Sequence, residues 1–342
     1  MNKLNYPQIY TKLTKGLSEK TKGIFERRFG IKSKNPETLE MIGKSMGITR
    51  ERVRQIEEAG FNFVKKNNKE TLDGVFAEFA DYFKNNGEFK KEEAVLEELG
   101  GKNHKPYVLF LLTLGEQFSK VCEKKDFYYF WSTMQDAKNK VSQTLKSLVL
   151  ALQKIGKPIF KEEFLTEISS SQNLPEPALF SYLEVSKKIQ NNSEGKIGLI
   201  DWPEIKPRGV KDKAFLVFKK HQKPLHFTKV AELIDQLGCN EPNKKTYPQT
   251  VHNELIKDQR FVLVGRGTYA LKEWGYEEGT IKDVIKKVLE SKTQPANKEE
   301  IIKEVLTQRL VASNTVLMNL NNKKYFGKDE QGKYFLRKTQ TA

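Results

Sequence analysis

Apolar residues between residues 38 and 63 recur at helical spacing and predict two helices joined by a tight turn. In the first helix Leu39, Ile42 and Met46 fall on one face, and Gly47 supplies the left-handed residue that ends it. The second helix places its charged residues opposite a narrow apolar stripe. That stripe consists of Val53, Ile56, Gly60 and Phe63.

The starts of both helices are specified by local signals. Thr38 and Thr49 are each placed to cap the N-terminus of the helix that follows, and Ile48 can pack on Val53 as a hydrophobic staple. Two helices with such a turn between them have the spacing of a helix-turn-helix, whose second helix offers its polar first turns to the DNA major groove.

The polar face of the second helix, "TRERVRQIEE", carries the side chains that distinguish base pairs. Arginine suits guanine, glutamine suits adenine, and glutamate can accept a hydrogen bond from cytosine. Composition alone favours the alternative of a solvated helix face, because charged residues at this spacing usually only face water. The caps, the preceding helix and the family resemblance of this segment together favour DNA recognition.

The segment of residues 17–66 resembles region 4 of bacterial primary-type sigma factors. The resemblance is carried by "RFGI", "TLEMIGK" and above all "TRERVRQIE". It implies that the second helix reads the upstream, minus-35 promoter element. Gly60 departs from the family, which has a better helix former there, and Gly74 follows soon after. We therefore expect a helix that is shorter or bent.

The resemblance also assigns roles to individual residues. Arg50, Glu51 and Gln55 correspond to base readers, Arg54 to a base or phosphate contact, and Arg52 to a phosphate contact. The whole expected DNA surface of this segment is Lys44, Thr49, Arg50, Glu51, Arg52, Arg54 and Gln55.

The remaining chain repeats a pattern of a short turn, an amphipathic helix and a final aromatic stretch. Matching turn residues are separated by 70, 66 and 71 positions, and the tryptophans by 71 and 72. A period of this length suits a small domain copied in tandem. The turn residues are Glu88, Pro158, Pro224 and Pro295, and the tryptophans are Trp131, Trp202 and Trp274.

Each copy reads as helix, short strand, helix, helix and hairpin, which is the plan of a winged helix. The sequence thus predicts a mainly α fold with small β-hairpins (α+β), in which a helix-turn-helix domain precedes tandem winged-helix units. The predicted boundaries are 1–70 for the first domain and 74–133, 137–205, 209–276 and 280–340 for the units.

The third copy, residues 210–276, resembles the HARE-type winged helix. That family occurs in the delta subunit of bacterial RNA polymerase, in some restriction endonucleases and in eukaryotic chromatin proteins. The resemblance is carried by "KPLHFTKVAELI" and "KTYPQTVHNELIKDQRFVLVGRGTYALKEWG". It implies the fold and assigns no functional residue.

Two features of the hairpins bear on nucleic-acid binding. Arg266 stands between two glycines at the predicted wing tip and is a candidate for phosphate contact. Several aromatic residues fit either base stacking or the core, and packing of hairpins on helices favours the core. These are Tyr128, Tyr129, Trp131, Tyr269 and Trp274.

Charge narrows the class of partner. The net charge of +16 favours polyanions, and residues 1–70 carry half of it, with 11 lysines and 5 arginines against 8 acidic residues. We expect double-stranded DNA as a partner, with the RNA polymerase core as a second. The sequence shows neither an apolar run of membrane-spanning length nor a signal peptide, so we expect a cytoplasmic protein without membrane contact.

No enzyme motif is recognisable in the sequence. P-loop, GxSxG, HExxH and paired CxxC motifs are absent, and we expect no catalytic residues, no cofactor and no small-molecule substrate. His221, His226 and His252 lack metal-ligand spacing and predict surface or packing roles, not a metal site. Cys122 and Cys239 lie far apart and suggest buried thiols.

Two functions remain open at this point. The first is a DNA-binding transcription regulator that acts with bacterial RNA polymerase and reads promoter-like duplex through its sigma-like helix. The second is a delta-like accessory subunit of RNA polymerase with little sequence-specific DNA binding of its own.

Overall fold

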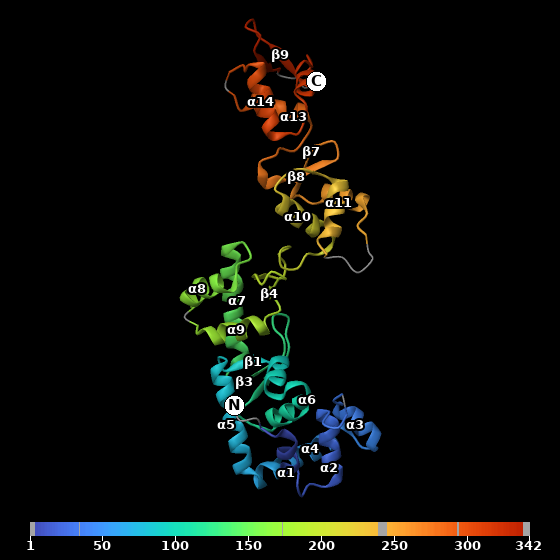
Figure 1. Cartoon of the computed structure of the whole chain (residues 1–342), viewed down its shortest axis with the longest axis vertical. Coiled ribbons are helices and arrows are strands. Elements are labelled where there is room, and N and C mark those ends of the chain that lie inside the picture. The colour runs from blue at the N-terminus through green and yellow to red at the C-terminus, as the bar shows by residue number, and fades with distance from the viewer. Residues whose placement is uncertain (1–3, 34, 173, 239–244, 293, 338–342) are drawn as a thin grey trace. The chain divides into compact units, whose positions relative to one another are not determined.

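A computed structural model describes residues 4–33, 35–172, 174–238, 245–292 and 294–337 (Figure 1). The chain divides into two compact units, Met1–Asp201 and Trp202–Ala342. Helices predominate in both, and the strands form short antiparallel pairs. The predicted mainly α fold with small β-hairpins is therefore confirmed.

Four helices begin the first unit and correspond to the sigma-like segment. They are α1 (Tyr6–Leu13), α2 (Glu19–Phe29), α3 (Leu39–Met46) and α4 (Arg50–Asn67).

The first winged-helix copy follows directly. Its helix α6 is two helices in succession, because Gly101 has φ 56° and ψ −157° and breaks the helical path. The sheet has the strand order β1-β3-β2. The elements are α5 (Lys69–Asn85), β1 (Phe89–Lys91), α6 (Glu92–Leu114), β2 (Ser119–Val121) and β3 (Phe130–Ser132).

The second copy completes the first unit, and the second unit holds the third and fourth copies. The second copy comprises α7 (Ala137–Ile155), α8 (Lys161–Gln172), α9 (Glu176–Val185), β4 (Ile189–Asn191) and β5 (Ile197–Leu199). The third comprises α10 (Gly209–His221), β6 (Leu225–His226), α11 (Phe227–Gln236), α12 (Pro248–Lys257), β7 (Phe261–Gly265), β8 (Thr268–Leu271) and the 3-10 helix η1 (Lys272–Trp274). The fourth comprises α13 (Ile281–Glu290), α14 (Lys298–Gln308), α15 (Ser313–Leu320), β9 (Phe326–Lys328) and β10 (Tyr334–Leu336).

The repeat seen in the sequence corresponds to a structural repeat. In every copy, the residue that follows the matching turn residue is buried and pairs with the hairpin of its own copy. The first strand of a winged helix makes this contact, so each copy has the winged-helix plan. The pairs are Phe89 with Ser132, Ile159 with Ile197, Leu225 with Tyr269, and Ala296 with Tyr334.

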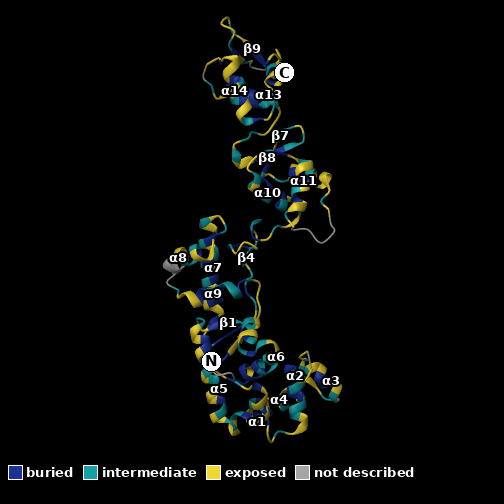
Figure 2. Ribbon diagram, in the orientation of Figure 1, coloured by how far each residue is buried: buried dark blue, intermediate teal, exposed yellow. Residues whose placement is uncertain are grey.

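The sigma-like helices and the first copy share one hydrophobic core. Phe110 of α6 lies among three rings of the sigma-like helices, with centroid distances of 5.4 Å to Phe25, 5.4 Å to Phe29 and 5.9 Å to Phe61. Figure 2 shows this buried region between α2, α4 and α6. Because the rings of α2 and α4 are covered by α6, the two parts pack as one body.

The second copy is joined to the first through α9, the third helix of its winged-helix plan. A Cβ at Gly87 would lie 2.4 Å from the Cα of Ala178, so the backbones are in close contact there. The Ser181 hydroxyl donates to the carbonyl of Asn86 at 2.6 Å, and the rings of Phe89 and Tyr182 are 4.7 Å apart. One side of α9 is thus occupied by β1 and the turn before it.

In the second unit, the segment after α14 lies along the edge of the third copy's sheet. β7 is an edge strand, because the strand order is β6-β8-β7. Leu310 donates its backbone N–H to the carbonyl of Val264 at 3.1 Å, and the Arg309 guanidinium donates to the carbonyl of Leu263. This part of the edge is therefore covered.

The aromatic and cysteine predictions have mixed outcomes. Trp131 and Tyr269 are buried at 3% and 2% exposure, which confirms the core assignment, whereas Tyr129 is 43% exposed and belongs to no core. Cys122 is exposed, so the prediction of a buried thiol is wrong at this position. Cys239 lies outside the described residues.

Candidate nucleic-acid interface

The turn between α3 and α4 has the geometry that the sequence predicts. The Thr38 hydroxyl accepts the N–H of Met41 at 3.2 Å, and the Thr49 hydroxyl accepts the N–H of Arg52 at 3.1 Å. Gly47 has φ 64° and ends α3 in the left-handed conformation. Both predicted caps and the glycine stop are confirmed, so the helix-turn-helix is defined locally.

The apolar faces of the two helices meet over α2. The fully buried centre of this cluster consists of Ile24, Ile42 and Val53. The partly buried residues packed against it are Leu39, Met46, Ile48 and Ile56. The predicted inward positions Leu39, Ile42, Met46, Val53 and Ile56 are thereby confirmed, and the opposite face of α4 is left for solvent or a ligand.

Gly60 is required by packing, and it does not interrupt α4. A Cβ at this position would lie 2.7 Å from Phe25 Cζ and 2.7 Å from Thr21 Cγ2, both on α2. The helix continues from Arg50 to Asn67, so the expectation of a shorter helix is wrong. Phe63 was predicted to face inward, but its side chain is 38% exposed. Val64 is buried in its place.

The predicted base readers lie together on the first turns of α4. Arg50, Glu51 and Gln55 are all exposed, and Glu51 and Gln55 lie on the side away from Val53. The side chain of Arg50 makes no hydrogen bond or ion pair with any residue that the structure describes. This group of side chains is therefore accessible to a major groove without any rearrangement of the core.

Three side-chain pairs organise this surface. Arg54 donates from Nη2 to Glu51 Oε1 at 2.8 Å and from Nη1 to Glu58 Oε2 at 3.0 Å. Arg52 donates from Nη1 to Gln55 Oε1 at 3.1 Å. The hydrogen bonds from Arg54 lower the pKa of Glu51, and Glu51 in turn raises the pKa of Arg54. Glu51 is thus ionised at neutral pH and can only accept hydrogen bonds.

The remaining predicted residues of this surface differ in availability. The Thr49 hydroxyl caps α4 by accepting the backbone N–H of Arg52. Lys44 is on α3 with a side chain 78% exposed, and it pairs with Glu40 at 3.0 Å. A surface pair of this kind is weak, so Lys44 remains available to a phosphate.

Two arginines that the sequence reasoning did not single out support the helix-turn-helix from α2. Arg27 binds both oxygens of Glu37, at 2.9 Å and 2.5 Å, and Arg28 donates to the carbonyl of Glu37 at 3.2 Å. Glu57 of α4 lies 3.6 Å from Arg28, and burial raises its pKa despite the attraction of the arginine. The available signal was "ERRF" before a turn that contains an acidic residue.

Arg266 belongs to the second unit and is described with it. It is exposed at the tip of the β7-β8 hairpin, as predicted, between Gly265 and Gly267. Gly267 has φ 66°, and a Cβ there would lie 2.4 Å from His226 Nε2. The glycine therefore allows the wing to close against His226, and Arg266 projects from a defined turn.

The histidines have structural roles in the same copy. His226 caps α11 by accepting the N–H of Thr228 at 3.4 Å, and His252 packs on the ring of Phe227 at 4.7 Å. Among the described residues, no group of three or more potential metal ligands is found. No helix in the described part of the chain is long and apolar enough to cross a membrane.

Two family models match the chain. Residues 15–66 match the model described as Sigma-70, region 4, and residues 208–274 match the HARE-HTH model, whose description names the HTH domain of ASXL and restriction endonuclease proteins. Both resemblances predicted from the sequence are thus confirmed, over nearly the predicted ranges. The matches support a DNA-binding, sigma-like role related to transcription, with double-stranded DNA as a partner.

Proposed function

We propose that this protein regulates transcription together with bacterial RNA polymerase and reads promoter-like duplex through α4. The observation that carries the proposal is the exposed, capped first part of α4, where Arg50, Glu51 and Gln55 stand on a rigid helix. These residue types offer both donors and acceptors to base edges in the major groove. The match to region 4 of sigma factors supports the same use.

The paired side chains on α4 have different roles in binding DNA. Arg52 orients Gln55 and has further donors for a phosphate, while Arg54 holds Glu51 with both carboxylate oxygens engaged. Side chains held in this way lose less conformational freedom on binding than free ones do. We infer that Glu51 and Gln55 give sequence preference and that Arg52 and Arg54 supply charge.

The third helices of the two winged-helix copies in the first unit, α6 and α9, are unsuited to binding a second major groove of DNA. In a winged helix the third helix normally lies in the major groove. Here the last part of α6 packs on the sigma-like helices through Phe110, and α9 packs on β1. Among these three helices, α4 is thus the one whose first turns are left open in the described part of the first unit.

The fourth copy offers a surface better suited to protein. α15, "SNTVLMNL", contains no charged residue, and its Met318 is 77% exposed. A helix without charge gains nothing from a phosphate backbone. This feature supports the proposed contact with the polymerase core, and it would serve the delta-like alternative equally well.

Selection of duplexes from a random pool by the full-length protein tests the proposal. The full chain is needed because residues 1–70 share their core with α6. We expect an enriched motif that is lost or relaxed at one base pair in Gln55→Ala. A parent protein that enriches no motif, yet retains RNA polymerase from lysate after nuclease treatment, would favour the accessory-subunit function instead.

A further inference from the structure

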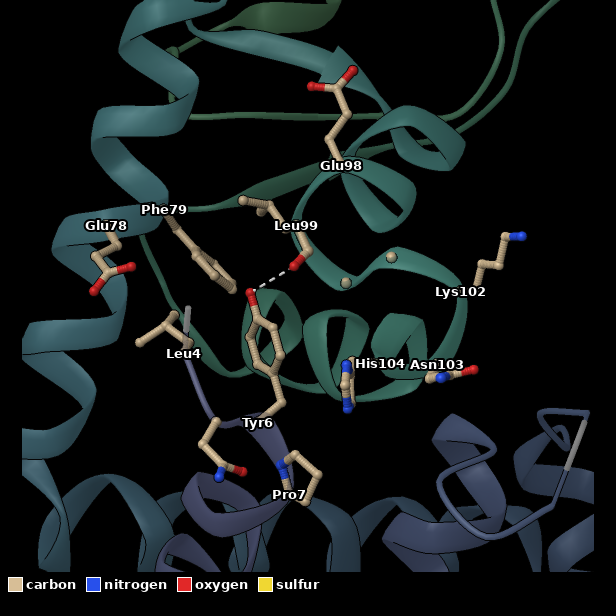
Figure 3. Close-up of a pocket in the computed structure, with 13 residues that line it drawn as sticks. Leu4, Tyr6, Pro7, Glu78, Phe79, Glu98, Leu99, Lys102, Asn103 and His104 are labelled. Carbon is tan, nitrogen blue, oxygen red and sulfur yellow. Dashed lines mark hydrogen bonds between the residues drawn. The ribbon is translucent and has the colours of Figure 1, made fainter. Parts of the chain in front are cut away.

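A cavity of about 650 Å³ opens in the first unit where α1, α5 and α6 meet (Figure 3). Two of its rings, those of Tyr6 and Phe79, are only 6% and 0% exposed, so the protein itself covers their faces. The Tyr6 hydroxyl donates to the carbonyl of Leu99 at 3.0 Å and joins α1 to α6. These side chains therefore hold the helices together, whereas the second unit carries accessible charge.

In the second unit, three lysine side chains of the fourth copy gather around the ring of Tyr325. The ammonium groups of Lys282, Lys286 and Lys324 lie 4.6, 4.9 and 5.8 Å from the ring centroid. Lys282 and Lys286 stand one turn apart on α13, and Lys324 precedes β9. The ring attracts each ammonium group but neutralises none of its charge. The three groups therefore repel one another, because the Debye length is about 10 Å at 0.1 M salt.

Carboxylates compensate little of this charge. Lys286 and Lys324 make no ion pair with any residue that the structure describes. Lys282 lies 3.9 Å from one oxygen of Asp283, whose other oxygen accepts the N–H of Thr280 at 2.8 Å and its hydroxyl at 2.6 Å. That carboxylate also forms the capping box of α13, so the three lysines keep a net positive charge.

Two exposed cations lie beside these lysines. Lys323 precedes Lys324 in the chain, and Arg337 donates its backbone N–H to the carbonyl of Tyr325 at 2.9 Å. Neither the Lys323 nor the Arg337 side chain makes an ion pair with a residue in the described part of the chain. We refer to Lys282, Lys286, Lys323, Lys324 and Arg337 together as the Tyr325 cluster.

The second and third copies also have basic residues just before the first strand of the hairpin, but there each one is paired with a carboxylate. The pairs are Lys187 with Glu123, Lys188 with Asp126, and Arg260 with Asp212 and Asp258. In the fourth copy, Lys323 and Lys324 take this place without a carboxylate partner among the described residues. The uncompensated charge is thus a property of the fourth copy and not of the repeat.

A group of lysines suits a phosphate backbone better than a protein surface. Lysine is depleted in protein–protein interfaces, whereas protein–DNA interfaces are strongly positive and make many of their hydrogen bonds to phosphate. We propose that the Tyr325 cluster holds the phosphate backbone of duplex DNA, as a contact separate from α4. This contact is independent of base sequence, and it leaves the uncharged α15 of the same copy available to protein.

Chemical footprinting of the full-length protein tests the proposal directly. Lysines are acetylated with and without a duplex of random sequence, and mass spectrometry measures the extent of acetylation at each position. We expect the duplex to protect Lys286 and Lys324. Lys298 and Lys303 should stay as reactive as before, because they are exposed on α14, which carries three glutamates. If Lys286 and Lys324 react equally with and without the duplex, the proposal is overturned.

Two double variants measure the contribution of the cluster. Lys286→Gln with Lys324→Gln removes two phosphate contacts, so the slope of log K against log salt should become shallower by about two on any duplex. Lys298→Gln with Lys303→Gln removes the same charge from α14 and should leave the slope unchanged. Equal slopes for the parent and the cluster variant overturn the proposal, as does an equal change in the two variants.

A further arm separates DNA from an acidic protein partner. Polyglutamate offers carboxylates in place of phosphates and should protect Lys286 and Lys324 less than the duplex does at an equal concentration of charge. Equal or greater protection by polyglutamate overturns the assignment to DNA in favour of an acidic protein segment. Selection of a motif from random duplexes reports on α4, and these measurements use no preferred sequence, so the two proposals can fail separately.

Discussion

Arg54 holds both carboxylate oxygens of Glu51 one turn earlier on α4, with Nε 3.0 Å from Oε2 and Nη2 2.8 Å from Oε1. The two residues expected to meet neighbouring parts of the duplex are therefore oriented by each other before binding. Because both oxygens of Glu51 are already engaged by Arg54, a cytosine amino group has to share an oxygen with the guanidinium. Glu51 thus disfavours any base that presents a hydrogen-bond acceptor to its carboxylate. Arg54 offsets the negative charge of Glu51 near the phosphates.

Gln55→Ala gives the clearest test of base reading. The substitution leaves the charge unchanged and lies opposite Val53, so the core should remain intact. We expect a loss of about 1 to 3 kcal/mol on the preferred site, with non-specific binding nearly unchanged. Competition binding against duplexes that differ at one base pair measures this. A variant that binds every duplex as the parent does would exclude the assigned role.

Arg52→Ala should weaken binding to every duplex, with a further loss on the preferred site because Arg52 also orients Gln55. If the basic surface of residues 1–70 neutralises about five phosphates, log K falls with log salt at a slope of roughly −4 to −5. Loss of one phosphate contact should make that slope shallower by about one. Binding constants at four or five salt concentrations determine it. A nearly flat slope for the parent would show that the basic charge is not used on DNA.

Gly60→Ala and Gly74→Ala should have opposite effects on stability. Alanine is favoured over glycine inside a helix by about 1 kcal/mol. At Gly74 a Cβ meets nothing within 4 Å, so that gain should appear in full. At Gly60 the Cβ would lie 2.7 Å from two side chains of α2, and overpacking costs about 1 to 3 kcal/mol.

Denaturant unfolding of both variants measures the two changes in free energy. We expect net destabilisation for Gly60→Ala and stabilisation for Gly74→Ala. If Gly60→Ala were as stabilising as Gly74→Ala, the close contact of α4 with α2 would be refuted.

Glu57→Gln should change how stability depends on pH. Burial raises the folded-state pKa of Glu57 above its ordinary value. The folded state therefore binds this proton more tightly than the unfolded state, and the associated stabilisation is present at low pH and is lost as pH rises through the raised pKa. The variant lacks this loss, so its stability relative to the parent should increase between acidic and neutral pH.

Thermal or denaturant unfolding from pH 3.5 to 7, in about half-unit steps around the ordinary glutamate pKa, follows this difference. Glu58→Gln, one residue later and exposed, is the matched control. A difference between parent and Glu57→Gln that stays constant over this range would contradict the raised pKa.

The helix-turn-helix could be predicted closely because its signals are local. Thr38, Gly47 and Thr49 act through hydrogen bonds or backbone angles within a few residues, and these depend little on the rest of the fold. The repeat was also visible, since each copy needs a buried first strand at the same place. The exposed polar face of α4 followed from the same periodicity.

Contacts between distant segments could not be predicted in this way. The stripe of α4 allows either Phe63 or Val64 to face inward, and the choice is made by the core that α5 and α6 add. Gly60 looked like a weak point because its partner ring, on Phe25, is 35 residues away. The cavity at Tyr6 likewise needs α1, α5 and α6 together, and no single segment indicates it.

Leu310 covers the edge of β7, and a shortened protein that lacks Leu310 should therefore behave differently. A chain ending near residue 279 would expose the backbone groups of Val264 and the apolar side chain of Leu263, which is already 47% exposed. A bare apolar edge strand is a template for pairing with a second molecule. We expect such a truncated chain to self-associate at concentrations where the full chain stays monodisperse in light scattering, and Leu263→Lys to restore it. The fourth copy would then protect the third copy from aggregation, in addition to any partner that it binds.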